Sequence, residues 1–211
     1  MALNGRTAPS HPSPSALAHC VVRTTLANFR NVVDFYIKLL SAHIVFEAEN
    51  MAFLRYDDEH HRIAVAAHPD ASPKSQDSIR AEFDHIAFTY PTLTALAQTY
   101  VSLKSSEPSV LPIWSVNHGM TSSMYYRDPD ENKVELQVDN FSTAEEADAF
   151  MSGPLFAQNP IGTDIEPNEW SSVILAKMKP DGTEGLGEEE VKEIKMRVEI
   201  GSRLDLPEIM A

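Results

Sequence analysis

The chain has 211 residues, of which 43% are hydrophobic and 23% are charged, and its formal net charge is −14 at pH 7. This composition is that of a globular protein with one sizeable core, and it lacks the basic surface that nucleic acid or an anionic membrane would need as a partner. No apolar run approaches the ~20 residues of a transmembrane helix. A single cysteine, Cys20, excludes an internal disulfide and favours a reducing, cytoplasmic location.

The first half of the chain predicts a βαβββ unit behind a flexible N-terminal segment at 1–15, which is rich in proline and serine. Apolar residues at helical spacing predict one helix, with Asn28 as its cap, and short apolar runs predict strands on either side of it. A polar linker at 69–78 then marks a boundary between modules. The expected elements are a strand at 16–24, a helix at 28–40, and strands at 44–48, 51–56 and 61–67.

The same order of elements begins again after the linker, with a strand at 83–89 and a helix at 93–103. Both halves have histidine as the third residue of their opening block, in Leu17-Ala18-His19 and Phe83-Asp84-His85. This internal similarity predicts a tandem duplication. We therefore expect an α+β domain at 16–140, in which two βαβββ modules, 16–68 and 82–140, form one cupped mixed sheet.

The remaining residues, 141–211, predict a helical C-terminal extension with helices at 143–151, 168–177 and 188–200. Thr143 precedes Glu145 and Glu146, a pattern typical of a helix N-terminus. The extension could cover a sheet face, close the cup or form a subunit interface, and the sequence does not choose among these.

One stretch of the second module, 116–140, carries the densest chemical pattern. Asp128-Pro129-Asp130 predicts a tight turn between two strands. In the second strand Val134, Leu136 and Val138 alternate with polar residues, and Glu135 stands in the middle of the polar face. A carboxylate in the centre of a strand is costly unless a positive group meets it, so Glu135 predicts a partner.

The duplication supplies candidates for that partner. Equivalent strands of two related modules should lie side by side, which would bring His19 and His85 together with Glu135. Two imidazoles and one carboxylate form the facial triad that leaves positions of an octahedral iron(II) ion open. A lone strand histidine is more often structural than a ligand, and the equivalence of the two histidines is what favours metal binding. The position equivalent to Glu135 in the first module is Ala64, whereas an isomerase of the glyoxalase type would want a fourth ligand there.

The sequence resembles the type I extradiol ring-cleavage dioxygenases of the vicinal oxygen chelate superfamily, in their single-domain form, over about residues 17–140. One position departs from the family pattern, because Glu131 stands where glycine or proline is usual. The residues that carry the resemblance are His118, Met124, Tyr125, Asp128, Pro129 and Glu135.

This resemblance implies iron(II)-dependent cleavage of a catechol-type aromatic by O2, with His19, His85 and Glu135 as metal ligands. It implies that His61 is the acid/base histidine, and that His118 and Tyr125 hold the substrate oxygens. A catechol must lose a proton to chelate iron, and a histidine can return one as the O–O bond breaks. The expected partners are an aromatic diol, O2 and further copies of the chain, and Trp114, Met120 and Met124 are candidates for an apolar wall.

Two other interpretations remain open at this point. The same cup could serve another metal-dependent isomerase, lyase or cyclase, or a metal-free protein that binds a small molecule. The ligand set suits manganese as well as iron. The sequence does not identify the substrate.

Overall fold

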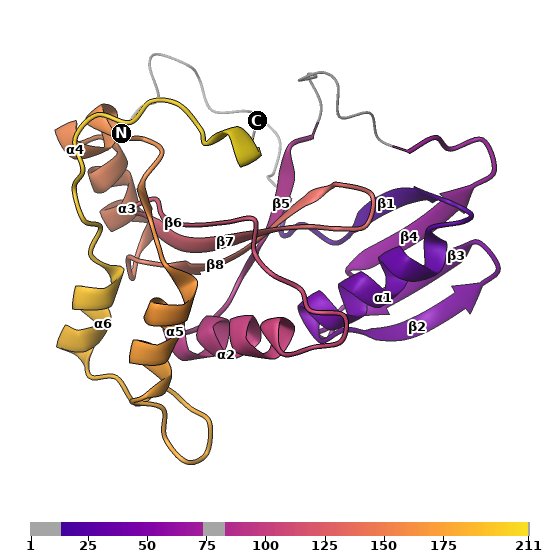
Figure 1. The fold of residues 1–211 in the computed structure, drawn as a ribbon, viewed down its shortest axis with the longest axis horizontal. Helices are drawn as coiled ribbons and strands as arrows, with labels where there is room; N and C mark the ends of the chain where they lie inside the picture. The colour runs from indigo at the N-terminus through magenta and orange to yellow at the C-terminus, as the bar shows by residue number, and fades with distance from the viewer. Residues whose placement is uncertain (1–13, 74–82, 211) are drawn as a thin grey trace.

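The computed structural model describes residues 14–73 and 83–210, which form two βαβββ modules and a helical extension (Figure 1). Most of the expected N-terminal segment at 1–15, and the second half of the linker at 69–78, lie outside the described residues. The two modules lie side by side along the long axis of the molecule.

The first module is a four-stranded mixed sheet with one helix packed on it. Its strand order is β1-β4-β3-β2, in which β1 runs parallel to β4 and the other neighbours are antiparallel. The predicted elements are all present with shifted ends, and the first strand begins four residues later than expected. The elements are β1 (Cys20–Thr25), α1 (Phe29–Leu40), β2 (His43–Ala48), β3 (Met51–Arg55) and β4 (Ile63–His68).

The second module repeats this topology, which confirms the predicted duplication. Its strand order is β5-β8-β7-β6-β9, and β5 runs parallel to β8 as β1 does to β4. Each module keeps its own sheet, and among the described strands none pairs across the modules. The elements are β5 (His85–Thr89), α2 (Leu93–Lys104), β6 (Trp114–Asn117), β7 (Thr121–Arg127), β8 (Lys133–Asp139) and the short β9 (Thr163–Asp164).

The registers of the two sheets confirm the predicted equivalence of Ala64 and Glu135. Val21 pairs with Ala64 two residues after His19, and Ala87 pairs with Glu135 two residues after His85. The first sheet therefore presents a methyl group at the position where the second sheet presents a carboxylate.

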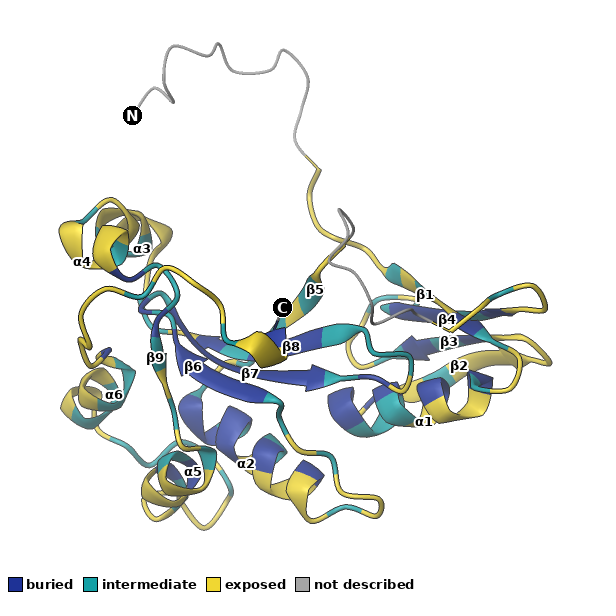
Figure 2. Ribbon diagram, turned by 45° about the horizontal axis from the view of Figure 1, so that its top comes forward, coloured by how far each residue is buried: buried dark blue, intermediate teal, exposed yellow. Residues whose placement is uncertain are grey.

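Helices α1 and α2 bury their apolar stripes against the same side of the two sheets (Figure 2). Both helices and the strands beneath them belong to one continuous core. Burial of this kind contributes about 25 cal/mol per Å² of apolar surface, so the shared core holds the modules together.

Helix α1 also makes the polar contacts that fix the first module to the second. The Tyr36 hydroxyl donates to Asp128 Oδ2 at 3.1 Å in a buried setting. Asn28 stands at the N-terminal cap position, as the sequence predicted, but its side chain makes no cap bond. Its amide instead donates to Asp130 Oδ1 at 2.5 Å, because the β7–β8 turn lies within reach.

The longer helices of the extension gather on the second module, at the end of the molecule away from the first sheet, and its last turn returns toward the middle (Figure 1). Helix α5 packs on α2, and β9 adds a strand to the second sheet. Thr143 forms the expected capping box with Glu146, whereas the last predicted helix ends at Lys195 rather than at residue 200. Its elements are α3 (Ala144–Met151), α4 (Pro154–Gln158), α5 (Pro167–Leu175), α6 (Glu188–Lys195) and a final 3-10 turn at Glu208–Met210.

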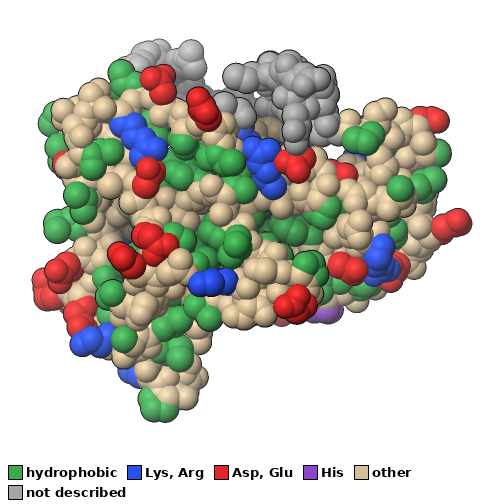
Figure 3. Space-filling view, viewed as in Figure 1, with side chains coloured by type: hydrophobic (Ala, Val, Ile, Leu, Met, Phe, Trp, Pro, Cys, Tyr) green, Lys and Arg blue, Asp and Glu red, His purple; other side chains and the backbone are tan. Residues whose placement is uncertain are grey.

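The surface is mixed in character. Acidic and basic side chains are interspersed on the face shown in Figure 3, and hydrophobic side chains gather between them. In the part of the chain that the structure describes, no helix has the length and apolar character needed to cross a membrane.

The β7–β8 turn holds Glu131 at a φ of +66°, in the left-handed region that L residues avoid at a cost of about 1 kcal/mol or more. We predict that Glu131→Gly raises the free energy of unfolding by about 1 kcal/mol, because glycine tolerates this conformation. Urea denaturation measures the change. Glu131→Ala is the matched control: it removes the exposed ion pair to Arg127 but keeps the Cβ atom, so it should not stabilise the chain. Equal stability of the two variants would contradict the strain.

Candidate functional site

His85 and Glu135 meet on the face of the second sheet that lies opposite α2. His85 opens β5, Glu135 stands in the middle of β8, and the parallel pairing of these strands places them on one face. Nε2 of His85 lies 3.0 Å from Oε2 of Glu135, whose side chain is buried. His85 is thus the positive partner that a mid-strand carboxylate requires.

A second carboxylate orients His85 from its other side. Nδ1 of His85 donates to Oδ2 of Asp84 at 2.7 Å, and Lys133 Nζ lies 2.6 Å from the other Asp84 oxygen. Hydrogen bonds to Glu135 raise the pKa of His85 above its ordinary value, and Asp84 adds to this against the effect of burial. Burial would raise the pKa of Glu135, but hydrogen bonds from His85 and Ser123 leave that pKa below its usual range.

The geometry of the His85–Glu135 pair fits two neighbouring ligand positions of a metal site. Two ligand atoms on adjacent octahedral positions, each about 2.1 Å from the metal ion, lie about 3.0 Å apart. The Nε2–Oε2 distance of 3.0 Å matches that separation. A histidine that binds a metal through one nitrogen commonly donates its other N–H to a carboxylate, and Nδ1 of His85 donates to Asp84 in the same way.

His118 and Tyr125 lie beside this pair. Nδ1 of His118 is 2.5 Å from the carbonyl oxygen of Ile161, which can only accept, so Nδ1 carries a proton. Nε2 then accepts from the Tyr125 hydroxyl at 3.0 Å. Burial lowers the pKa of His118, and burial together with the charge of Glu135 raises that of Tyr125. The pair is therefore a neutral imidazole and a neutral phenol.

Trp114 forms an aromatic wall next to these residues. Its ring stacks on Tyr125, with ring centroids 5.2 Å apart, and meets His118 edge on. The buried side chain of Met210 belongs to the same small apolar cluster. Met124, expected in this wall, is wholly buried and pairs with Leu136, so it faces the α2 side of the sheet and that expectation was wrong.

The other two predicted residues, His19 and His61, lie together on the first module. Their rings are 4.4 Å apart, and the ring of His61 stacks on that of Phe53 at 4.6 Å. Burial lowers the pKa of His61, and the neighbouring His19 and His60 lower it further.

The structure thus forms two groups where one was expected. His85, Glu135, His118 and Tyr125 lie together on the second sheet, and His19 and His61 lie together on the first. Among the described residues, no group of three or more His, Cys, Asp or Glu side chains is placed to hold a metal ion.

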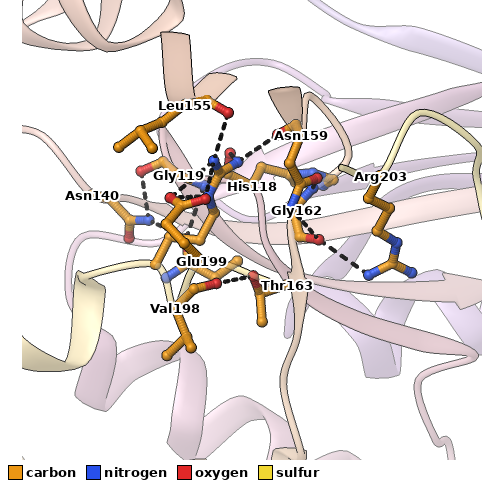
Figure 4. A network of polar contacts seen from close by, with 12 residues as sticks. His118, Gly119, Asn140, Leu155, Asn159, Gly162, Thr163, Val198, Glu199 and Arg203 are labelled. Atoms are coloured by element: carbon orange, nitrogen blue, oxygen red, sulfur yellow. Dashed lines mark hydrogen bonds and ion pairs between the residues drawn. The ribbon is translucent and has the colours of Figure 1, made fainter. Parts of the chain in front are cut away.

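The extension holds His118 in place through Arg197, a role that the sequence did not reveal. The Arg197 guanidinium is buried and donates to the carbonyl oxygens of His118 at 3.2 Å and Asn159 at 2.7 Å, and to Leu155. Glu199 balances its charge at 3.0 Å. Figure 4 shows His118, Leu155, Asn159 and Glu199 converging on one network. No local sequence pattern links residues about 80 positions apart, so the sequence could not predict that Arg197 contacts His118.

The comparisons with known proteins identify one superfamily. A family model described as the Glyoxalase/Bleomycin resistance protein/Dioxygenase superfamily matches residues 16–136. Two curated proteins of Rhodococcus globerulus are similar to the chain. Biphenyl-2,3-diol 1,2-dioxygenase 2 is 43% identical over 71% of this chain and 76% of its own length. Biphenyl-2,3-diol 1,2-dioxygenase 3 is 40% identical over 72% of this chain and 77% of its own length.

Among solved structures, a glyoxylase/bleomycin resistance protein/dioxygenase domain from Frankia sp. EAN1pec aligns with 64% of this chain and 99% of its own. The TM-score of this alignment is 0.49 and the sequence identity is 15%.

We predict that Arg197→Met lowers the free energy of unfolding by about 3 kcal/mol, because it leaves buried carbonyl oxygens without a donor. Urea denaturation measures this loss. The His118 imidazole should also lose its fixed environment, which its NMR resonances report. Arg197→Lys, which restores the charge but not the fork of donors, should fall between wild type and Arg197→Met. Unchanged His118 resonances in Arg197→Met would contradict the positioning role.

The metal-free chain should show a pH-dependent contribution of His85 to stability. Because the folded-state pKa of His85 is raised, its contribution is fully present below the unfolded pKa of about 6.5 and is lost as the pH rises through the folded value. With a chelator present, the difference in unfolding free energy between wild type and His85→Gln should be largest near pH 5.5 and shrink toward pH 8.5. A difference that grows with pH would contradict this sign.

Proposed function

The chain belongs to the Glyoxalase/Bleomycin resistance protein/Dioxygenase superfamily, and from this we propose that it is an iron(II)-dependent extradiol dioxygenase. Its relatives at 43% and 40% identity are both diol dioxygenases, and this chain is an oxidoreductase of the same ring-cleaving class. The observation that carries the proposal is the His85–Glu135 pair, which lies beside a neutral His118–Tyr125 pair.

The names of the relatives define the type of cleavage. A 2,3-diol has its hydroxyl groups on carbons 2 and 3, so a 1,2-dioxygenase opens the bond beside the diol and not the bond within it. We propose the same reaction here on a catechol-type aromatic. Both atoms of O2 enter the ring-opened product, so no external reductant is required.

Such an enzyme uses a metal cofactor, and we propose His19, His85 and Glu135 as its protein ligands. Iron(II) suits this donor set, and manganese(II) is compatible with the same ligands. When bound, the ion would hold the two diol oxygens and O2 in one coordination sphere and so activate both reactants. Ala64 supports open coordination positions, because its methyl group cannot add a fourth protein ligand.

The two neutral residues beside the metal site have complementary roles in this proposal. Nε2 is the unprotonated nitrogen of His118, and once the Tyr125 hydroxyl turns from it to the bound diol, Nε2 is free to accept the proton that a catechol loses on chelation. The hydroxyl of Tyr125 stays protonated because its pKa is raised, and it donates a hydrogen bond to the negative oxygen that results. Trp114 and Met210 provide an apolar surface for the aromatic ring.

We assign His61 the acid/base role at the ring-opening step. Its lowered pKa keeps the imidazole largely neutral near pH 7, so it can first accept a proton and then return it. Its position against Phe53 fixes the plane of the ring.

A cytoplasmic location, expected from the lone cysteine, is also part of this proposal.

The proposal is tested by purifying the chain anaerobically, determining its metal, and adding iron(II) and a panel of catechols in air. A coloured ring-opened product, with matching O2 uptake, is the expected result. Iron binding without cleavage of any catechol would favour an isomerase, lyase or cyclase. Small-molecule binding without any metal would favour a binding protein.

We predict that His61→Ala retains the metal but lowers kcat about 100-fold or more, the typical loss for a positioned acid/base group. Steady-state kinetics and metal analysis on the same preparation measure the two effects. His68→Ala is the control, because this histidine is exposed at the end of β4 and should leave both values unchanged. Undiminished turnover in His61→Ala would remove it from the mechanism.

A further inference from the structure

The end of the chain returns to the candidate site. Its last turn, Glu208–Met210, here called the C-terminal turn, lies over the second sheet on the side away from α2, which is the face of the site (Figure 2). Met210 is only 4% exposed and packs in one cluster with Trp114 and Tyr125. Its neighbour Ile209 is 47% exposed. Met210 is therefore the apolar side chain through which the C-terminal turn attaches to the sheet.

Two cationic side chains hold the backbone of the C-terminal turn. Nη2 of Arg127 donates to the carbonyl oxygen of Ile209 at 2.7 Å. Nζ of Lys133 donates to the carbonyl oxygen of Met210 at 2.8 Å. A guanidinium and an ammonium each carry several donors, so each can hold a carbonyl oxygen and a second group at the same time.

Both cations also have carboxylate partners outside the C-terminal turn. Nη1 of Arg127 lies 2.8 Å from Glu131. Nζ of Lys133 lies 2.6 Å from Asp84, the carboxylate that accepts from His85. If the turn leaves the sheet, the two cations keep these partners and lose only a neutral carbonyl oxygen each. The C-terminal turn can therefore detach without disturbing the groups that orient His85.

The segment that leads to the C-terminal turn is fixed at one end and exposed after it. Nη1 of Arg203 donates to Asp164 at 2.8 Å, and its guanidinium lies 5.8 Å from the ring centroid of Trp114. Beyond this anchor, Leu204 is 64% exposed and Leu206 is 51% exposed. Segments with few buried apolar contacts open at low free energy. The chain end is thus a short tether with an anchor at Arg203 and a separate attachment at the site.

Met210 occupies surface that an aromatic substrate would also use. In the proposed reaction the diol oxygens lie beside Tyr125 and the His85–Glu135 pair, and the ring packs along Trp114. Met210 covers the neighbouring part of the same aromatic surface. A group on the ring that extends along Trp114 therefore meets Met210 first. Methionine is unbranched and flexible, so its side chain adapts to a small group but still fills the space of a large one.

We propose that the C-terminal turn is a detachable cover of the site, and that Met210 is a specificity-determining residue that limits the size of the group a diol can carry. With the cover closed, the site takes a diol with a single ring. A second ring has to displace Met210, and the C-terminal turn moves with it. This inference rests on the proposed function for its substrate class, but the cover itself can be tested without metal or substrate.

The first test measures how far acrylamide quenches the fluorescence of Trp114 in the metal-free chain. The chain has two tryptophans, so all variants carry Trp170→Phe as the background. Trp114 is 8% exposed, and quenching in this background should be weak. Met210→Ala removes the attachment and Arg127→Met removes one backbone anchor, so each should increase the quenching. Unchanged quenching in either variant overturns the cover.

Two matched controls accompany this measurement. Met196→Ala makes the same change in the extension at a side chain that is 69% exposed. Glu131→Ala removes the ion pair of Arg127 but leaves its donor to Ile209 in place. Both should quench as the background does. Quenching that rises as much in Glu131→Ala as in Arg127→Met overturns the anchoring of the C-terminal turn through Ile209.

The second test compares kcat/KM for 3-phenylcatechol and for catechol after anaerobic loading with iron(II). The ratio of the two values should rise about 10-fold or more in Met210→Ala, because a change of even one methylene in an apolar pocket alters discrimination by that amount. Met196→Ala should keep the ratio of wild type. An unchanged ratio in Met210→Ala, or an equal loss for both diols, overturns the role of Met210 in specificity.

The two tests separate this inference from the function on which it rests. Failure of wild type and all variants to cleave any diol contradicts the proposed function and, with it, the role of Met210 in specificity. The quenching of Trp114 still decides whether the C-terminal turn is a cover, because it requires neither metal nor turnover. Cleavage with an unchanged ratio contradicts the inference alone.

Discussion

The buried carboxylate of Asp128 is the group on which both the site and the arrangement of the modules depend. It accepts hydrogen bonds from the backbone of Asp130 and Asn132, which shapes the β7–β8 turn and so sets Tyr125 opposite Glu135. It also accepts the hydroxyl of Tyr36, which ties α1 to that turn. A buried carboxylate without such donors would be strongly destabilising. The Asp128 side chain therefore fixes the position of Tyr125 beside Glu135, and it also holds the first module against the second.

Local patterns were sufficient to predict most of the fold. Helical spacing predicted α1 and α2, alternation predicted β8, and the two His-bearing blocks predicted the duplication that the parallel β1–β4 and β5–β8 pairs confirm. The mid-strand position of Glu135 predicted a positive partner, and the structure shows His85 there. These features depend on neighbours in sequence or on a repeat, which is why the sequence alone could predict them.

Other features depend on contacts between distant residues and leave no local pattern. Met124 is an exception, because strand alternation places it on the side of the sheet opposite Tyr125 and a local pattern could have predicted this. Asn28 contacts the β7–β8 turn about 100 residues away, and Arg197 holds a loop of the second module from the extension. The sequence predicted from pseudo-symmetry that His19 would meet His85, but the structure places His19 beside His61 and His85 beside Glu135, because each module keeps its own sheet.

Ala64 stands at the position where the second module has Glu135, so the two modules differ in chemistry at equivalent positions. The two modules descend from one pattern, yet only the second can contribute an acidic ligand. At this position the second sheet carries the buried carboxylate of Glu135, which meets His85, and the first sheet carries only a methyl group. This one position therefore makes the duplicated halves chemically unequal: the two copies share a topology, but only the second carries an acidic side chain at this point of its sheet.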